Sequence, residues 1–268
     1  MENIRPHNKE NAIKSVAFAF ELDKEINEEN ITSIREWYKK NIAFKSLFKD
    51  EQLIQSIQVK MGNDIKQISS SNIGGVIFIK KAEGTETPEW LIRIDARSIS
   101  ITCNLYSRWE EIWGLTLDYI AEIIAQLSGF VLTKLALEYL DEFYIFNTDE
   151  NIWLPQLFKT TAPYIPQFVY AMNAPWHTHN GFITEEKESS VGRRTVNIIN
   201  LTYQKTSGPD DILTIQTQHA SSFYEKFYFS VSSLKKIDEV MRYNHIENKK
   251  LFDNLLSDEM LKEIKLKV

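Results

Sequence analysis

The chain has 268 residues, of which 43% are hydrophobic and 25% are charged, a balance typical of a folded globular protein. The formal net charge of −6 provides no general excess of basic side chains for a nucleic-acid backbone, so we expect no nucleic-acid partner. Cys103 is the only cysteine, which excludes an intrachain disulfide and fits a reducing compartment. No apolar run reaches the roughly 18 residues of a membrane span, and the N-terminus lacks the apolar core of a signal peptide. We therefore expect a cytoplasmic protein without membrane contact.

The first half of the chain is expected to combine strands with a helix. Alternating apolar and polar residues put every second side chain on one face, which is the pattern of a half-buried strand. This pattern predicts strands over residues 14–22, 64–69, 75–81, 90–94 and 99–105. Asn27 or Asn30 can cap a helix that continues to about Phe48, whereas residues 52–61 fit a helix or a strand. We expect residues 70–74 to form the turn of a hairpin.

A long apolar helix over residues 107–127 is the predicted centre of the fold. Ser107 and Glu110 have the spacing of a capping box, in which each side chain satisfies a backbone N–H of the other. Apolar residues cover most of the circumference of this helix, so we expect it to be buried. Gly129 provides a helix stop, and a strand over residues 131–143 follows, against which the helix is expected to pack.

The second half of the chain repeats this plan in outline. The predicted strands cover residues 131–143, 167–171, 176–184, 195–204 and 212–219. A short helix is expected within residues 149–158, a long helix from Ser232 or Ser233, and a final helix capped by Ser257. The predicted fold class is α+β, with two similar β-α-(antiparallel β meander)-α units over residues 1–129 and 130–268. We expect the helices to pack on one face of a mainly antiparallel sheet.

Several short motifs resemble a sporadically distributed family of uncharacterised prokaryotic proteins. They are Tyr106-x-x-Trp109-Glu110, His245 followed by Phe252, and Leu256-Ser257-Asp258-Glu259. In the strand after the central helix the family has Leu-Arg-Tyr-x-Asn, where this chain has Leu137-Glu138-Tyr139-Leu140-Asp141. Two acids therefore replace the family's Arg and Asn, so a role of that basic position does not carry over. The resemblance implies the two-unit architecture and would suit an accessory role, such as one in a defence or toxin-related operon.

The segment Trp176-His177-Thr178-His179 is a candidate metal site. On a strand, His177 and His179 project to the same face, and two imidazoles so spaced can hold one divalent metal ion. His219 is a candidate third ligand, and such a site could activate water for hydrolysis. Because a His-x-His pattern arises easily by chance, the alternative is a partly exposed strand end with two polar histidines.

Two further groups of charged residues are candidate contact sites. Glu138, Asp141 and Glu142 could hold Mg²⁺ or divide acid and base roles, or could be solvated and paired with arginines. Arg193 and Arg194 could bind an anion, but adjacent strand residues point to opposite faces, and charged residues commonly protect sheet edges. The structural interpretation is favoured for both groups.

The sequence contains no P-loop, no GxGxxG, no GxSxG, no HExxH and no CxxC pair. The favoured hypothesis is therefore a non-catalytic binding module for a protein partner or a small ligand, without a cofactor. Trp90, Trp176 and Tyr203 are its expected contact aromatics, and a homodimer could form through a sheet edge or the final helix. The alternative is a metal-dependent hydrolase centred on His177, His179 and His219.

Overall fold

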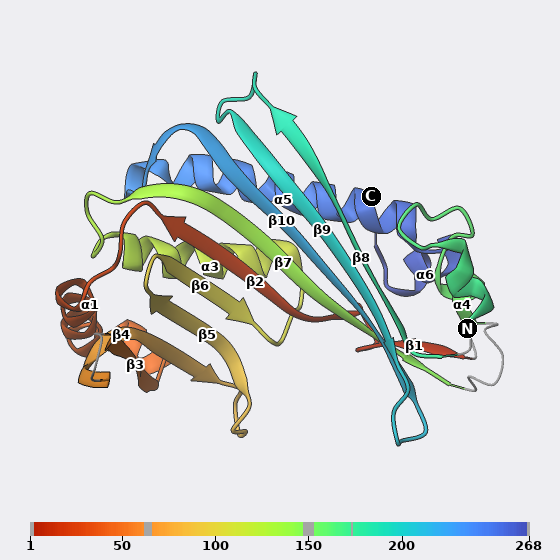
Figure 1. Cartoon of the computed structure of the whole chain (residues 1–268), viewed down its shortest axis with the longest axis horizontal. Coiled ribbons are helices and arrows are strands. Elements are labelled where there is room, and N and C mark those ends of the chain that lie inside the picture. The colour runs from red at the N-terminus through yellow and green to blue at the C-terminus, as the bar shows by residue number, and fades with distance from the viewer. Residues whose placement is uncertain (1–2, 62–65, 147–152, 173, 267–268) are drawn as a thin grey trace. The chain divides into compact units, whose positions relative to one another are not determined.

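The computed structural model describes residues 3–61, 66–146, 153–172 and 174–266, with side chains described outside 56–72. Its strands form one antiparallel sheet in the order β3-β4-β5-β6-β2-β7-β10-β9-β8, with β1 paired to β7, so the fold is α+β (Figure 1). The strands are β1 (Ile4–Pro6), β2 (Ile13–Leu22), β3 (Asp50–Met61), β4 (Lys66–Lys81), β5 (Pro88–Asp95), β6 (Ser98–Cys103), β7 (Val131–Ile145), β8 (Trp176–Glu186), β9 (Arg193–Gln204) and β10 (Asp211–Tyr228). The helices are α1 (Glu28–Lys40), α2 (Ile42–Leu47), α3 (Trp109–Ile124), α4 (Trp153–Leu157), α5 (Leu234–Leu255) and α6 (Asp258–Glu263), with 3₁₀ helices η1 (Gln167–Ala171) and η2 (Val231–Ser233).

The chain forms two compact units, and each is built from separate segments of sequence. Unit 1 comprises Met1–Val16, Ala136–Tyr224 and Asp238–Val268, and unit 2 comprises Ala17–Leu135 and Glu225–Ile237. This division differs from the contiguous units 1–129 and 130–268 expected from the sequence, because it falls inside β2, β7, β10 and α5. Both halves of the chain do contain a strand, a helix, an antiparallel meander and a helix in that order. A duplication behind this repeated order stays a prediction.

Aromatic packing between α3 and its neighbours forms the core of unit 2. Trp109 and Trp113 stack with ring centroids 5.6 Å apart, and both contact Phe18 of β2. The predicted capping box of this helix is wrong. Arg108 is the N-cap and makes no side-chain cap bond, while Ser107 Oγ donates to the Glu111 carboxylate at 2.7 Å. Ser107 lies one residue too early to cap the first turn.

The expected helix from Asn27 to Phe48 is divided into two. Asn27 caps α1 in a reciprocal capping box with Asn30. Asn41 then takes an extended conformation that ends α1, and its side chain accepts from the Phe44 N–H to start α2. An asparagine between two helical turns can therefore stop one helix and cap the next.

The expected hairpin over residues 64–81 is a single strand where it is described, because β4 runs through Gly75 to Lys81; residues 64 and 65 lie outside the described part. A Cβ at Gly75 would lie 2.5 Å from Ile94 O and 2.8 Å from Asp95 Cβ. The glycine thus permits a close approach of β4 and β5 and does not mark a turn. Residues 52–61, which fitted either element, belong to β3.

In unit 1, α5 lies along one face of β9 and β10 (Figure 1), and the buried side chains of these strands point to that face. Part of the covered face is polar. Ser221 Oγ donates to Asn244 Oδ1 at 3.0 Å, and the Asn244 amide donates to the His219 carbonyl at 3.3 Å. The predicted strand at 167–171 is wrong, since η1 follows Pro166 there and buries Val169.

Candidate functional site

The opposite face of the unit 1 strands carries no helix in the described part of the chain and is the candidate site. We call it the open face. It consists of alternate residues of β8, β9 and β10, whose side chains are exposed or half-buried, together with Glu138 of β7. The strand register places His179 opposite Asn200, and Asn200 opposite Gln216. Three polar side chains from three strands therefore meet in one row.

Hydrogen bonds join this row to Glu138, and we call the connected set the polar ladder. His179 Nδ1 contacts Asn200 Oδ1. Asn200 Nδ2 donates to Gln216 Oε1 at 3.0 Å, and Gln216 Nε2 donates to Glu138 Oε1 at 3.0 Å. Gln218 Nε2 donates to the second carboxylate oxygen at 3.3 Å. The polar ladder thus crosses four strands and comprises His179, Asn200, Gln216, Gln218 and Glu138.

The polar ladder has a direction, because each amide group has one donor end and one acceptor end. Asn200 and Gln216 both donate towards the Glu138 carboxylate, so the Asn200 oxygen is left to accept from His179. In the neutral imidazole the proton is then on Nδ1, and Nε2 is an acceptor without a partner among the described residues. Each amide also keeps one unused N–H, so the ladder presents both donors and acceptors to solvent.

An apolar row lies beside the polar ladder on the same face. Ile183, Val196 and Ala220 are neighbours across β8, β9 and β10. Ile183 is 50% exposed and Val196 is 37% exposed, so solvent reaches both branched side chains. Next to this row, Glu185 lies opposite Arg194. The open face therefore combines hydrogen-bonding, apolar and charged strips within three strands.

The three histidines of the predicted metal site do not come together. His177 and His179 are exposed on the open face, as their spacing predicted. His219 is 1% exposed and lies on the opposite, covered face, where its ring nitrogens contact the Asn197 and Asn248 amides at 2.7 and 3.1 Å. Burial lowers the pKa of His219. Because amides occupy both nitrogens, His219 has none left for a metal, and no cluster of three potential ligands occurs in the described residues.

The predicted contact aromatics are buried, which corrects their assignment to a contact surface. Trp90, Trp176 and Tyr203 are at most 7% exposed. Trp90 packs edge-on against Tyr119 at 5.3 Å, and Tyr203 donates to Asp211 at 2.6 Å. These rings point to the covered side of their strands, so they fill the core and do not reach a partner.

The acidic residues predicted to act together have three different environments. Glu138 lies in the polar ladder. Asp141 is buried without a hydrogen-bond partner for Oδ2 among the described residues, and burial raises its pKa to about 8. For Glu142, burial opposes ionisation, but hydrogen bonds from Lys14, Tyr144 and His7 outweigh it and lower the pKa. The three carboxyl groups therefore do not share a metal or divide acid and base roles.

The two neighbouring arginines point to opposite faces, as expected for a strand. Arg193 is 2% exposed and pairs with Glu186 at 2.6 Å, whereas Arg194 is exposed. The Arg193 guanidinium also lies 4.2 Å from the centre of the Tyr243 ring. Arg193 is therefore a structural residue, and only Arg194 is placed to meet a ligand.

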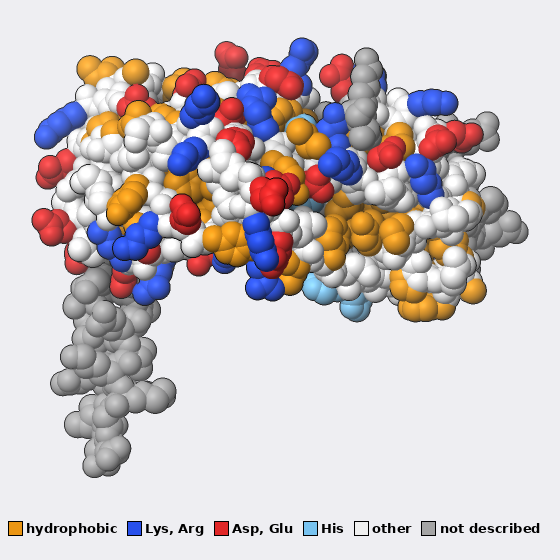
Figure 2. Space-filling view, turned by 90° about the horizontal axis from the view of Figure 1, so that it is seen from above, with side chains coloured by type: hydrophobic (Ala, Val, Ile, Leu, Met, Phe, Trp, Pro, Cys, Tyr) orange, Lys and Arg blue, Asp and Glu red, His pale blue; other side chains and the backbone are white. Residues whose placement is uncertain are grey.

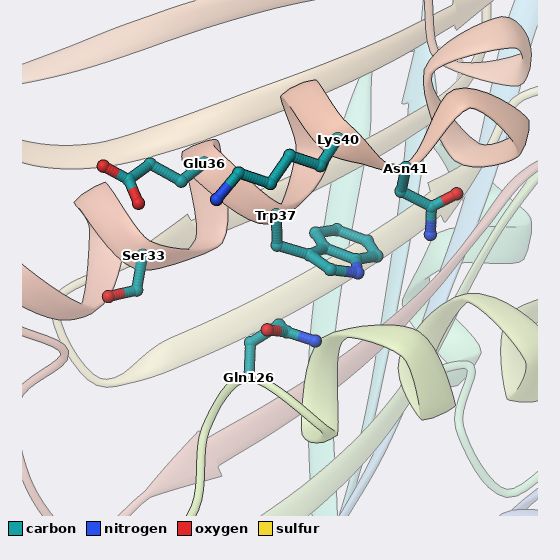
Figure 3. Close-up of a pocket in the computed structure, with 6 residues that line it drawn as sticks. All are labelled: Ser33, Glu36, Trp37, Lys40, Asn41 and Gln126. Carbon is teal, nitrogen blue, oxygen red and sulfur yellow. The ribbon is translucent and has the colours of Figure 1, made fainter.

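The hollows described in the structure lie away from the open face. One in unit 2, of about 440 Å³, has the half-buried Trp37 between Lys40 of α1 and Gln126 (Figure 3). A second, of about 610 Å³, is lined by lysines paired to acids, such as Lys81 with Asp50 at 3.1 Å. A third, of about 670 Å³, lies between α4 and α6. Trp37 was not singled out from the sequence, because a tryptophan within a helical pattern is normally a core residue.

Comparison of the chain with protein-family models, curated proteins and solved structures gave no match. Among the described residues, no helix combines the length and the apolar character needed to cross a membrane.

Proposed function

We propose that this protein is a non-catalytic binding module that holds a protein partner on the open face of unit 1. The observation that carries the proposal is the polar ladder, a continuous row of hydrogen bonds from His179 to Glu138 on a sheet face that no helix of the described residues covers. Small-molecule sites are usually concave, whereas protein interfaces are broad and combine polar with apolar strips. The open face has this second character.

The polar ladder favours binding because its side chains are held in place before a partner arrives. Asn200 and Gln216 are each fixed by two neighbours, so a partner that pairs with their unused N–H groups immobilises little further side-chain motion. Ile183 and Val196 add exposed apolar surface next to these polar groups. On the open face Glu185 lies opposite Arg194, and acidic and basic side chains are likewise interspersed in the view from above in Figure 2. We infer a partner of mixed character and not a highly charged polymer.

The ladder geometry supports binding over hydrolysis. Amide donors hold both oxygens of Glu138, at 3.0 and 3.3 Å, and Glu138 reaches His179 only through two intervening amides. No nucleophile and base are adjacent in this row. An accessory role in a prokaryotic defence or toxin-related operon is part of the same proposal, and the identity of the partner tests it.

The test is affinity capture from a native extract with wild-type protein and with Asn200→Ala and Gln216→Ala variants, followed by mass spectrometry. Lys45→Ala is the matched control, since Lys45 is exposed on α2 in unit 2. We expect both ladder variants to lose a protein that the wild type and the control retain. The purified partner should then bind the ladder variants at least tenfold more weakly in calorimetry. Equal capture by all four proteins, or no specific partner of the wild type, would overturn the proposal.

A further inference from the structure

Strand β8 is an unprotected sheet edge. It is last in the strand order, so only β9 pairs with it among the described strands. Edge strands present unpaired backbone N–H and C=O groups, which natural proteins protect with prolines, lysines or β-bulges. The eleven residues from Trp176 to Glu186 include no proline and no lysine, and their register with β9 has no shift. The other edge strand, β3, carries a register shift between Ile54 and Gln55.

The sequence of β8 is complementary to itself in an antiparallel arrangement. If Gly181 lies on a two-fold axis, His177 of one copy is opposite Glu185 of the other, and Thr178 is opposite Thr184. An imidazole N–H can donate to a carboxylate, and threonine pairs are favourable across antiparallel strands. The glycine at the axis places no side chain where the two copies approach most closely.

A third pair of this register covers exposed apolar surface. His179 of one copy would lie beside Ile183 of the other, and Ile183 is 50% exposed. Phe182 is also partly exposed and already stacks on Tyr164 at 6.3 Å, which holds its ring beside the edge. Lys187 contacts Glu185 at 3.4 Å but lies beyond the end of β8, so it leaves the edge open.

We propose that β8 pairs with β8 of a second copy of this chain, antiparallel and about a two-fold axis at Gly181. Each copy then satisfies the outward-facing backbone groups of the other, and the open faces of the two copies become parts of one longer sheet. The proposal does not depend on the partner proposed above. Asn200→Ala removes a side-chain contact of His179, but both Asn200→Ala and Gln216→Ala leave the sequence and the outward-facing backbone groups of β8 unchanged, so the two proposals fail separately.

The first test is the molar mass in analytical ultracentrifugation over a range of protein concentrations. We expect a concentration-dependent dimer of the wild type and a monomer of Ile183→Lys, because an edge lysine opposes strand pairing. Val196→Lys is the matched control: Val196 lies opposite Ile183 on the same face but in β9, away from the edge. The control should remain dimeric. A monomeric wild type, or equal dimerisation of all three proteins, would overturn the proposal.

The second test fixes the register by disulfide formation. His179→Cys and Ile183→Cys proteins are oxidised separately and as an equal mixture, and a non-reducing gel is run. The native Cys103 is buried and does not interfere. We expect a crosslinked dimer only in the mixture, because His179 and Ile183 of different copies are opposite each other in the proposed register. A crosslink in one variant alone, or none in the mixture, would exclude the axis at Gly181.

Discussion

The phenol oxygen of Tyr139, on β7, lies 2.9 Å from Nδ1 of His245, on α5. Burial is the main reason that the pKa of His245 falls to about 4, and the nearby cations Lys249 and Arg242 lower it further. The imidazole is therefore neutral in the folded protein at pH 7. It would accept a proton at pH values below about 6.5 if the chain unfolded.

This difference predicts an acid-sensitive contribution to stability. The contribution is present above pH 6.5 and is lost as the pH falls towards 4, because the unfolded chain binds the proton more tightly. At about 1.36 kcal/mol per pKa unit, the loss attributable to His245 is about 3 kcal/mol. The free energy of unfolding, measured with urea, should change less with pH in His245→Gln than in the wild type over this range. Tyr139→Phe keeps the imidazole, so its free energy of unfolding should change with pH as in the wild type. Parallel profiles of wild type and His245→Gln would contradict the prediction.

For Asp141 we predict the opposite pH dependence of the free energy of unfolding. Its pKa is raised from 3.8 to about 8 by burial, so the folded protein holds the proton more tightly than the unfolded chain. The contribution of this group to the free energy of unfolding is therefore highest below pH 4 and falls as the pH rises through 8, by about 6 kcal/mol at most. Asp141→Asn should unfold at higher urea concentration than the wild type at pH 9, with the difference shrinking at pH 5. A difference that does not change with pH would show that Asp141 is not protonated in the fold.

We predict that replacing glycine by alanine has opposite effects on the free energy of unfolding at Gly75 and at Gly114. A Cβ at Gly75 would meet the backbone oxygen of Ile94 at 2.5 Å, whereas a Cβ at Gly114 in α3 would meet nothing within 4 Å. Gly75→Ala should cost about 1–3 kcal/mol of unfolding free energy through overpacking. Gly114→Ala should add about 0.5–1 kcal/mol through helix propensity. Denaturant unfolding of both variants checks this, and equal midpoints would refute the close approach of β4 and β5.

We predict that the fold needs Glu186, the carboxylate partner of the buried Arg193, for its stability. The Arg193 side chain is 3% exposed and pairs with Glu186 at 2.6 Å, so Glu186→Gln leaves a buried cation without a counterion. This loss should cost about 3 kcal/mol. Glu185→Gln is the control. Because Glu185 is exposed, this substitution should change the free energy of unfolding by no more than about 0.5 kcal/mol. Thermal unfolding of both variants provides the measurement; similar midpoints would show that the buried pair contributes little.

The sequence predicted those elements whose buried face is apolar. The burial of β2 alternates without a break, that of β7 alternates from Leu135 to Asp141, and both strands lie within one or two residues of the expected bounds. The strand expected over residues 212–219 continues as β10 to Tyr228. This end was missed because the covered face is polar there: His219 and Ser221 are buried, although such residues look solvent-facing in a sequence. His219 and Ser221 have their hydrogen-bond partners on β9 and α5. These partners come from other elements of the fold, so no local pattern reveals them.

The candidate site was only partly predictable for a related reason. His179 and Glu138 were both selected from the sequence, but for two separate sites. The amides of Asn200 and Gln216 that connect them were not selected, because isolated amides give no chemical signal. Their importance depends on the register between β8, β9 and β10, which alternation within a single strand does not specify.

The buried amides under α5 limit where this helix can sit. Asn244 and Asn248 are one helical turn apart, and they meet Ser221 and His219 respectively. Sliding the helix by one turn in either direction would leave at least one of these enclosed polar groups without its counterpart. A purely aliphatic contact would tolerate such a shift at little cost. The two amides therefore fix α5 at a single position along the strands.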